Sequence, residues 1–239
     1  MNKEILEIRI VFNNVIIGYC SYLKLEKEMY TSASFFSLKD FHFLKEVTFN
    51  QEDVVNIQIY YYNKFNVKIH LLDFGIFVID DLIQDEYLKI FGLLIPIDGT
   101  IYDQRIIDIF YKWQNNEDID WWKMDKDYKK SYIYCCGSWS GLSKEVSRKD
   151  YIIDCSIVNE ELDFYYLLAS TFFGNRGYFG DYTYTLGDCL TEIYTNSTSL
   201  ANLKVDFLHH EKIIKVLGLD VFNEICFLFE NSGVKILKK

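Results

Sequence analysis

Alternating apolar and polar positions dominate the first third of the chain. The run "ILEIRIVF" (5–12) alternates, and residues 54–74 mix β-branched and aromatic residues with polar ones. This period of two is typical of half-buried strands. The residues "NKFN" (63–66) predict a hairpin turn, and "FGIFVIDDLI" (74–83) continues the strand pattern. We therefore expect residues 1 to about 75 to be rich in strands.

Helical spacing first becomes clear in residues 102–116, where four apolar side chains form one stripe: Ile106, Ile109, Phe110 and Trp113. Residues 115–132 form a charged connector that carries two tryptophans. The following run "YIYCCGSW" (132–139) is predicted to be a strand.

A polar segment over residues 140–150 is predicted to be the domain boundary, because its only large apolar residues are Leu142 and Val146. This boundary predicts a β-rich N-terminal domain over residues 1–140 and a second domain over residues 150–239.

The second domain combines strand patterns and helix patterns. In chain order, we expect a strand (150–158), a helix (159–173), a glycine-rich loop (174–180), a helix (181–194), a strand (200–210), one or two helices (210–233) and a final strand (234–239). Asn159 and Asp181 are the expected N-caps of the first two helices. This order predicts a small, partly parallel sheet packed with helices, so the fold class is α+β or α/β.

The helix predicted over residues 181–194 carries an acid, Asp188, that is flanked on both sides by uncharged residues. One stripe of this helix is apolar and predicted to be buried: Leu186, Leu190 and Ile193. The stripe about opposite is predicted to face outward: Tyr184, Asp188, Thr191 and Thr195. Gly187 costs roughly 1 kcal/mol of helix propensity relative to alanine. It also leaves room for another surface to approach closely.

The composition favours a folded protein with a basic partner. Half of the 239 residues are apolar, and the formal net charge is −10 with a pI near 4.9. Binding to nucleic acid phosphates requires Lys and Arg, so we do not expect nucleic acid as a direct partner. Opposite charges steer association, so a basic protein partner fits better. The alternative is that the charge serves only solubility.

The sequence also predicts a cytoplasmic location. Glu4 and Glu7 interrupt the first apolar run, which argues against a signal peptide, and no run reaches the length of a membrane span. The six cysteines lack C-x-x-C spacing and are expected to be reduced and mostly buried.

The sequence contains no recognisable catalytic or metal-binding motif. The run "GSWSG" (137–141) has Trp139 where a nucleophile elbow needs serine. His42 and His70 are isolated and are expected to be structural. We therefore expect a protein that is not an enzyme and needs no metal or cofactor.

The segment "GYFGDYTYTLGDCL" (177–190) resembles the inhibitory segment of the barstar family, the intracellular inhibitors of barnase-type ribonucleases. In that family a Tyr–aromatic–Gly triplet leads into a helix that contains an Asp–Cys–Leu triplet. The corresponding triplets here are residues 178–180 and 188–190. The resemblance extends to the order of elements from about Asp150 to Lys239, and it does not cover residues 1–140.

The resemblance implies roles for particular residues. Asp188 would occupy the place of the substrate phosphate in the ribonuclease, held by arginines and a histidine of that enzyme. Tyr178 would lie on the side of the catalytic histidine, and Thr191 would lie at the rim. Glu224, on the last helix, would add an acidic contact. A carboxylate can replace phosphate in this way because both accept two hydrogen bonds from an arginine.

Three positions depart from the family pattern. Tyr184 replaces an acidic residue, Gly187 replaces a frequent tryptophan, and Tyr182–Thr183 replaces Asn–Leu. The departures indicate a target other than barnase itself, with Tyr182 and Tyr184 as replacement aromatic contacts. The complete expected partner-binding set is Asp188, Tyr178, Tyr184, Thr191, Gly187, Tyr182, Asp181 and Glu224.

The resulting hypothesis is an immunity protein that inhibits a cognate ribonuclease or other nuclease toxin. A second interpretation is a barstar-like fold that serves as a general interaction module, with specificity in the N-terminal domain. A third is an enzyme with a site in the N-terminal half.

Overall fold

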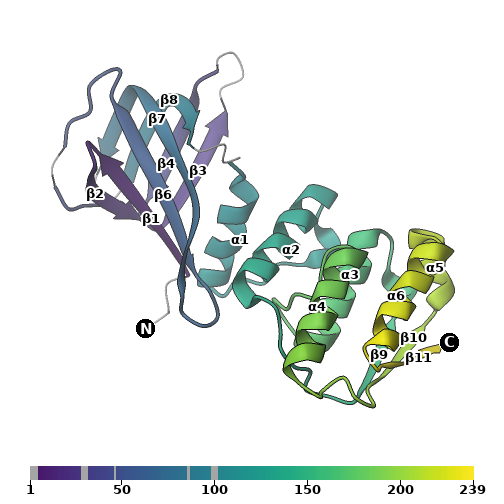
Figure 1. Ribbon diagram of the computed structural model, residues 1–239. Coiled ribbons are helices and arrows are strands. Elements are labelled where there is room, and N and C mark those ends of the chain that lie inside the picture. The colour runs from purple at the N-terminus through teal and green to yellow at the C-terminus, as the bar shows by residue number, and fades with distance from the viewer. Residues whose placement is uncertain (1–4, 28–31, 46, 85–86, 98–101) are drawn as a thin grey trace. The chain divides into compact units, whose positions relative to one another are not determined.

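The computed structural model describes residues 5–27, 32–45, 47–84, 87–97 and 102–239 (Figure 1). The chain forms two compact units, Met1–Asp120 and Trp121–Lys239. The first contains an eight-stranded antiparallel sheet and one helix, and the second contains a three-stranded parallel sheet and five α-helices within the described residues. The expected mixture of α and β structure is therefore confirmed.

The sheet of the first unit has the strand order β3-β4-β8-β7-β6-β1-β2-β5. Its strands are β1 (Leu6–Phe12), β2 (Val15–Cys20), β3 (Tyr22–Lys27), β4 (Ser34–Lys39), β5 (His42–Phe43), β6 (Val54–Tyr62), β7 (Lys68–Gln84) and β8 (Tyr87–Pro96). The predicted strand-rich region and the turn at 63–66 are confirmed. In that turn, the side chain of Asn63 accepts hydrogen bonds from the backbone N–H groups of Phe65 and Val67, each at 3.0 Å.

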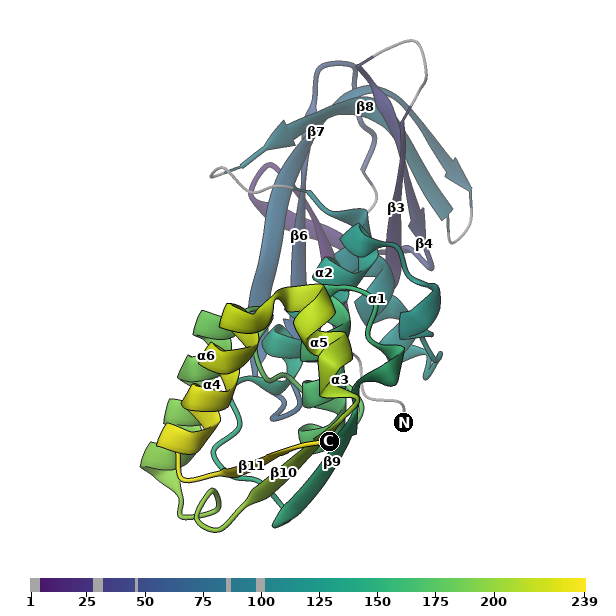
Figure 2. The ribbon, with the colours of Figure 1, turned by 90° about the vertical axis from the view of Figure 1, so that its right-hand side faces the viewer.

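The helix α1 (Gln104–Gln114) lies against both β1 and β3. Four strands separate β1 from β3 in the sheet, so the sheet curls around the helix into half of a barrel (Figure 2). The side-chain oxygen of Gln114 accepts hydrogen bonds from Ile5 and Leu6, and that of Gln104 accepts one from Leu25. The helix thus supplies acceptors to backbone groups at two distant parts of the sheet.

The second unit contains the parallel sheet, with strand order β11-β10-β9. In chain order, its elements are the 3₁₀ turn η1 (Trp121–Lys123), α2 (Lys126–Ser140), β9 (Asp150–Asp154), the 3₁₀ turn η2 (Cys155–Ile157), α3 (Glu161–Phe173), α4 (Thr183–Asn196), β10 (Lys204–Leu208), α5 (His210–Leu217), α6 (Leu219–Asn231) and β11 (Lys235–Lys238). Both strand pairings are parallel. The sheet is therefore fully parallel, whereas the sequence predicts a partly parallel sheet.

One face of this small sheet is covered by helices (Figure 2). Tyr151 and Ile153 of β9 join the hydrophobic core, whereas Asp150 and Ile152 alternate with them and are exposed. Parallel strands require crossover connections, and the helices that make these connections here bury their apolar faces on the same side.

A buried polar network attaches α2 to α3. Lys129 donates to Asp163 (2.8 Å) and to Glu160 (2.6 Å), and the indole N–H of Trp121 also donates to Asp163 (2.8 Å). The second carboxylate oxygen of Asp163 accepts from the backbone N–H groups of Asn159 and Glu160. Asp163 is fully buried, so these hydrogen bonds compensate for the loss of water around its charge.

The charges of this network set the pKa values of its members. Burial alone would lower the pKa of Lys129, but hydrogen bonds to Asp163 and Glu160 outweigh burial and raise it. Burial alone would raise the pKa of Asp163, but its hydrogen bonds with Lys129, Asn159 and Trp121 hold that pKa below the ordinary value. Both groups therefore favour the folded state in their charged forms.

The structure differs from the sequence prediction over residues 121–140. The run 132–139 is not a strand but the second half of α2, which begins where Asp125 caps the backbone N–H of Tyr128. Its aromatic and β-branched residues are compatible with strands, but packing in the second unit decides in favour of the helix. The two compact units accordingly divide between Asp120 and Trp121, before the polar segment 140–150.

Both expected N-caps lie next to the observed ones. The helix α3 is capped by Glu160 rather than Asn159, and α4 by Tyr182 rather than Asp181. In each case a side chain inside the helix accepts hydrogen bonds from the backbone N–H groups at the helix start. Thr185 accepts from Asp181 (2.9 Å) and Tyr182 (3.2 Å), which fixes the start of α4 one residue later.

We predict that Asp163→Asn lowers the free energy of unfolding by about 3 kcal/mol, because it removes the buried one of the two carboxylates that pair with Lys129. Urea unfolding of the full chain measures this loss. Asp127→Asn, at an exposed acid of α2, is the matched control and should change stability by less than about 0.5 kcal/mol. Similar values for the two variants would contradict the structural role of the network.

The pH dependence of stability gives a second test of the network around Asp163. The folded-state pKa of Asp163 is lowered, so its contribution is complete above the unfolded value of about 4 and disappears as pH falls through the folded value. We expect wild type to lose more stability than Asp163→Asn on acidification, measured by unfolding at neutral and acid pH. Equal losses would contradict this assignment.

Candidate functional site

The helix α4 has the two faces that the sequence predicts. Its apolar stripe is buried in the core of the second unit: Leu186, Cys189, Leu190 and Ile193. The opposite stripe is exposed: Tyr184, Asp188, Thr191 and Thr195. Tyr184 is 73% exposed and Tyr182, at the start of the helix, is 49% exposed. Both predictions about this helix are therefore confirmed.

Asp188 lies in the middle of the exposed stripe. Within the described part of the chain, its carboxylate makes no hydrogen bond and no ion pair. The backbone that carries it is fixed, since Leu186 and Leu190 on either side are almost fully buried. The carboxylate is therefore a charge on a rigid support that can accept donors from outside the chain.

Gly187 has a neighbour within its own unit. A Cβ atom added at Gly187 would lie 3.5 Å from a methyl carbon of Leu228 on α6. The glycine is partly exposed. At that distance an added methyl group would make ordinary van der Waals contact with Leu228, so the packing of α4 against α6 does not require glycine here. That Gly187 leaves room for a partner stays a prediction.

Glu224 is exposed on α6, one helical turn before Leu228. Residues four apart share a helix face, so Glu224 extends the α6 stripe that packs beside α4. Figure 1 and Figure 2 show these two helices side by side. Two exposed acids, Asp188 and Glu224, thus lie on neighbouring helices.

The loop before α4 is built from three residues with different environments. Phe179 is fully buried and contacts the rings of Phe172 and Phe229. Gly180 has φ of 90°, and a Cβ there would lie 2.6 Å from the backbone nitrogen of Leu186, so the position requires glycine. Tyr178 is half-buried. Burial, reinforced by the negative charge of Asp181, raises the pKa of its hydroxyl to about 12.

One neighbour of this loop, α2, is not predicted by the sequence analysis. The ring of Tyr178 packs on Gly137 of α2, where an added Cβ would lie 3.3 Å from the ring. The signal was available, because Tyr134, Gly137 and Gly141 recur at helical spacing. It was missed because the segment was interpreted as a strand.

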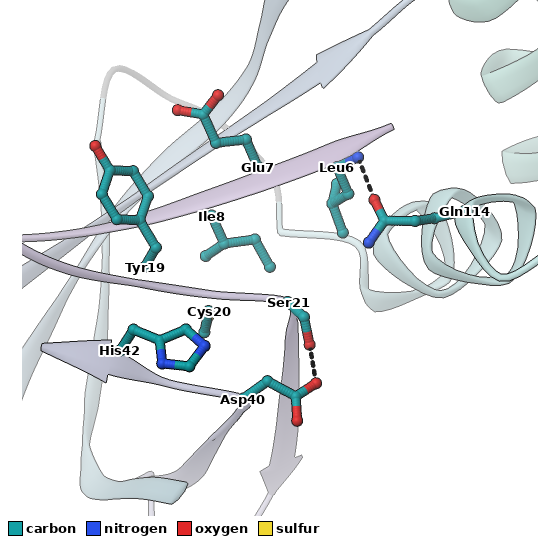
Figure 3. A pocket seen from close by; sticks show the side chains of 9 residues that line it. All are labelled: Leu6, Glu7, Ile8, Tyr19, Cys20, Ser21, Asp40, His42 and Gln114. Carbon is teal, nitrogen blue, oxygen red and sulfur yellow. Dashed lines mark hydrogen bonds between the residues drawn. The ribbon is translucent and has the colours of Figure 1, made fainter. Parts of the chain in front are cut away.

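A separate pocket of about 470 Å³ lies in the first unit (Figure 3). Its lining includes Tyr19, Asp40 and His42. Two other lining residues are held by hydrogen bonds, since the hydroxyl of Ser21 donates to Asp40 and the side chain of Gln114 accepts from Leu6. This arrangement offers a polar recess with a carboxylate and an imidazole.

Two further findings concern cofactors and membranes. Among the described residues, no group of three or more His, Cys, Asp or Glu side chains could hold a metal ion. The helices of the described chain are all too short or too polar to cross a bilayer. The six cysteines are buried and form no disulfide with one another, as expected of apolar core residues.

Comparisons with known proteins add no assignment for this chain. No family model matches it, and neither a curated protein nor a solved structure matches.

We predict that Asp188→Ala and Tyr184→Ala each change the free energy of unfolding by less than about 0.5 kcal/mol, because both side chains are exposed and lie outside the core. Leu190→Ala, on the buried stripe of the same helix, should cost about 2–5 kcal/mol. Urea unfolding measures all three variants. A loss for Asp188→Ala as large as that for Leu190→Ala would make the acid a structural residue.

Proposed function

We propose that this protein inhibits a basic nuclease, as an immunity protein against a cognate ribonuclease toxin, by covering the enzyme's active site with α4 and the loop before it. The observation that carries the proposal is the exposed carboxylate of Asp188 on a rigid helix, with exposed tyrosines beside it. In this role Asp188 replaces a substrate phosphate and accepts hydrogen bonds from arginines of the nuclease.

Charge supports a basic target. The net charge is −10, and Glu224 lies on the helix next to α4. A nuclease binds polyanionic RNA and therefore carries a basic active site. An acidic surface of the inhibitor would speed the encounter and suppress wrong partners.

Aromatic residues supply the remaining contact area. Tyr184 lies one helical turn before the acid, Tyr182 lies at the start of α4, and half-buried Tyr178 lies in the loop before it. Each is a large side chain with few rotatable bonds. Tyrosines of this kind lose little conformational entropy on binding and are enriched at energetically important positions of interfaces. Tyr184 stands where the barstar family pattern has an acidic residue, and Tyr182 and Tyr184 serve as replacement aromatic contacts for the tryptophan that is Gly187 here.

The element order is a further support. From β9 to β11 the second unit runs strand, helix, helix, strand, helix, helix, strand, with all three strands parallel. This is the order on which the resemblance to the barstar family was based. The resemblance and the exposed face of α4 concern the same segment and support the same role.

We predict that Asp188→Ala weakens binding to a barnase-type ribonuclease by about 2–5 kcal/mol, because the arginines that face it would be left buried and unpaired. Calorimetric titration of the full chain measures this change. Asp150→Ala is the matched control: it removes the same charge from the sheet face that the helices do not cover, and it should bind like wild type. An unchanged affinity of Asp188→Ala would contradict phosphate mimicry.

A second candidate function places specificity in the first unit, so that the second unit is a general interaction module. The pocket around Tyr19, Asp40 and His42 favours it, because it is a polar recess in a part of the chain that the resemblance does not cover (Figure 3). Under this alternative Asp40→Ala would abolish partner binding, and Asp188→Ala would leave it intact.

A further inference from the structure

The helix α2 precedes the segment that resembles the barstar family, yet it borders the loop that carries Tyr178. Four residues of α2 or its C-terminal end share one face at helical spacing: Tyr134, Gly137, Ser138 and Gly141. This face and the loop line a pocket of about 380 Å³, which we call the α2 pocket; Leu142, Tyr178 and Asp181 complete the lining used below.

The α2 pocket has aromatic and aliphatic walls. Tyr134 is 52% exposed and Leu142 is 46% exposed, so both present apolar surface to solvent at the mouth. Gly137 forms the floor, where the absence of a side chain lets the ring of Tyr178 lie close to the helix. An apolar recess of this size accommodates one long side chain of a partner.

Among the described residues that line the α2 pocket, Asp181 is the only charged one. One of its carboxylate oxygens accepts a hydrogen bond from Thr185 (2.7 Å). The other makes no hydrogen bond within the described chain. The pocket thus combines two tyrosine rings with a carboxylate that still has acceptor capacity.

These features select arginine as the occupant. A guanidinium stacks on aromatic rings and pairs with a carboxylate in a planar fork, while its aliphatic stem covers apolar surface. Lysine offers a more strongly hydrated point charge and stacks less well. The acidic net charge also favours a cationic occupant over an acidic or neutral one.

We propose that the α2 pocket receives an arginine side chain of the partner nuclease, stacked against Tyr134 and Tyr178 and paired with Asp181. The inference rests on the proposed function, because it assumes that the partner covers the loop before α4. It extends that function by assigning α2, outside the segment that resembles the inhibitor family, to the binding surface and to the choice of target.

The test has two arms on the full chain. In the first, the tyrosine ring signals are followed by NMR while N-acetylarginine amide is added, with N-acetyllysine amide as the comparison. We expect saturable shifts of Tyr134 and Tyr178 with the arginine compound, weaker shifts with the lysine compound, and loss of both in Asp181→Asn. Absence of a saturable shift at these two rings would overturn the proposal whether or not a nuclease binds.

In the second arm, calorimetry compares Tyr134→Ala and Asp181→Asn with Asp188→Ala in binding a barnase-type ribonuclease. We expect each pocket variant to weaken binding about tenfold or more. The controls Ile152→Ala and Asp150→Asn, on the uncovered sheet face, should bind like wild type. Loss of binding in Asp188→Ala but not in the pocket variants would overturn the pocket and leave the proposed function standing. The reverse result would overturn phosphate mimicry and leave the pocket.

Discussion

The buried charge of Asp163 is the constraint on which the arrangement of the second unit depends. A fully buried carboxylate is tolerated only when hydrogen bonds replace its water, and three different segments supply them here: Trp121, Lys129 and the backbone before α3. The indole of Trp121 also stacks on Tyr166 of α3, with ring centroids 4.2 Å apart. These hydrogen bonds and the ring contact hold residues 121–140 against α3, as part of the second unit.

This attachment has consequences for the candidate site. Because α2 is held against α3, Gly137 lies under the ring of Tyr178 and limits where that ring can move. The next residue, Phe179, is buried in the core, and Gly180 turns the chain into α4. A continuous series of packed groups thus runs from the charge network to the helix that carries Asp188. A site that is held in place before binding loses less entropy when the partner arrives.

The sequence predicted those parts of the site that depend on local periodicity. The buried and exposed stripes of α4 follow from 3.6-residue spacing alone, and so does the outward position of Asp188. The strands of the first unit were predictable from alternation. In contrast, the role of residues 132–139 depends on Asp163 and Tyr178, which lie more than 20 residues away along the chain. No local pattern contains that information.

Two smaller differences have the same origin. Asp181 has the chemistry of an N-cap, yet Thr185 takes over the N–H groups at the helix start and leaves Asp181 at the rim of the α2 pocket. In the same way, Asp163 accepts hydrogen bonds from the backbone N–H groups of Asn159 and Glu160, and Glu160 rather than Asn159 is the N-cap of α3. In both cases a side chain inside the helix determines where the helix begins.

The central claim is that Asp188 occupies the phosphate position of a nuclease. The most direct measurement is competition: the affinity of the chain for a barnase-type ribonuclease, determined with increasing concentrations of a mononucleotide that binds the enzyme's active site. We expect mutual exclusion, with the apparent Kd rising linearly with the nucleotide concentration once that concentration exceeds the Kd of the nucleotide. An affinity that stays constant at saturating nucleotide would contradict the claim, because inhibitor and phosphate would then bind at the same time.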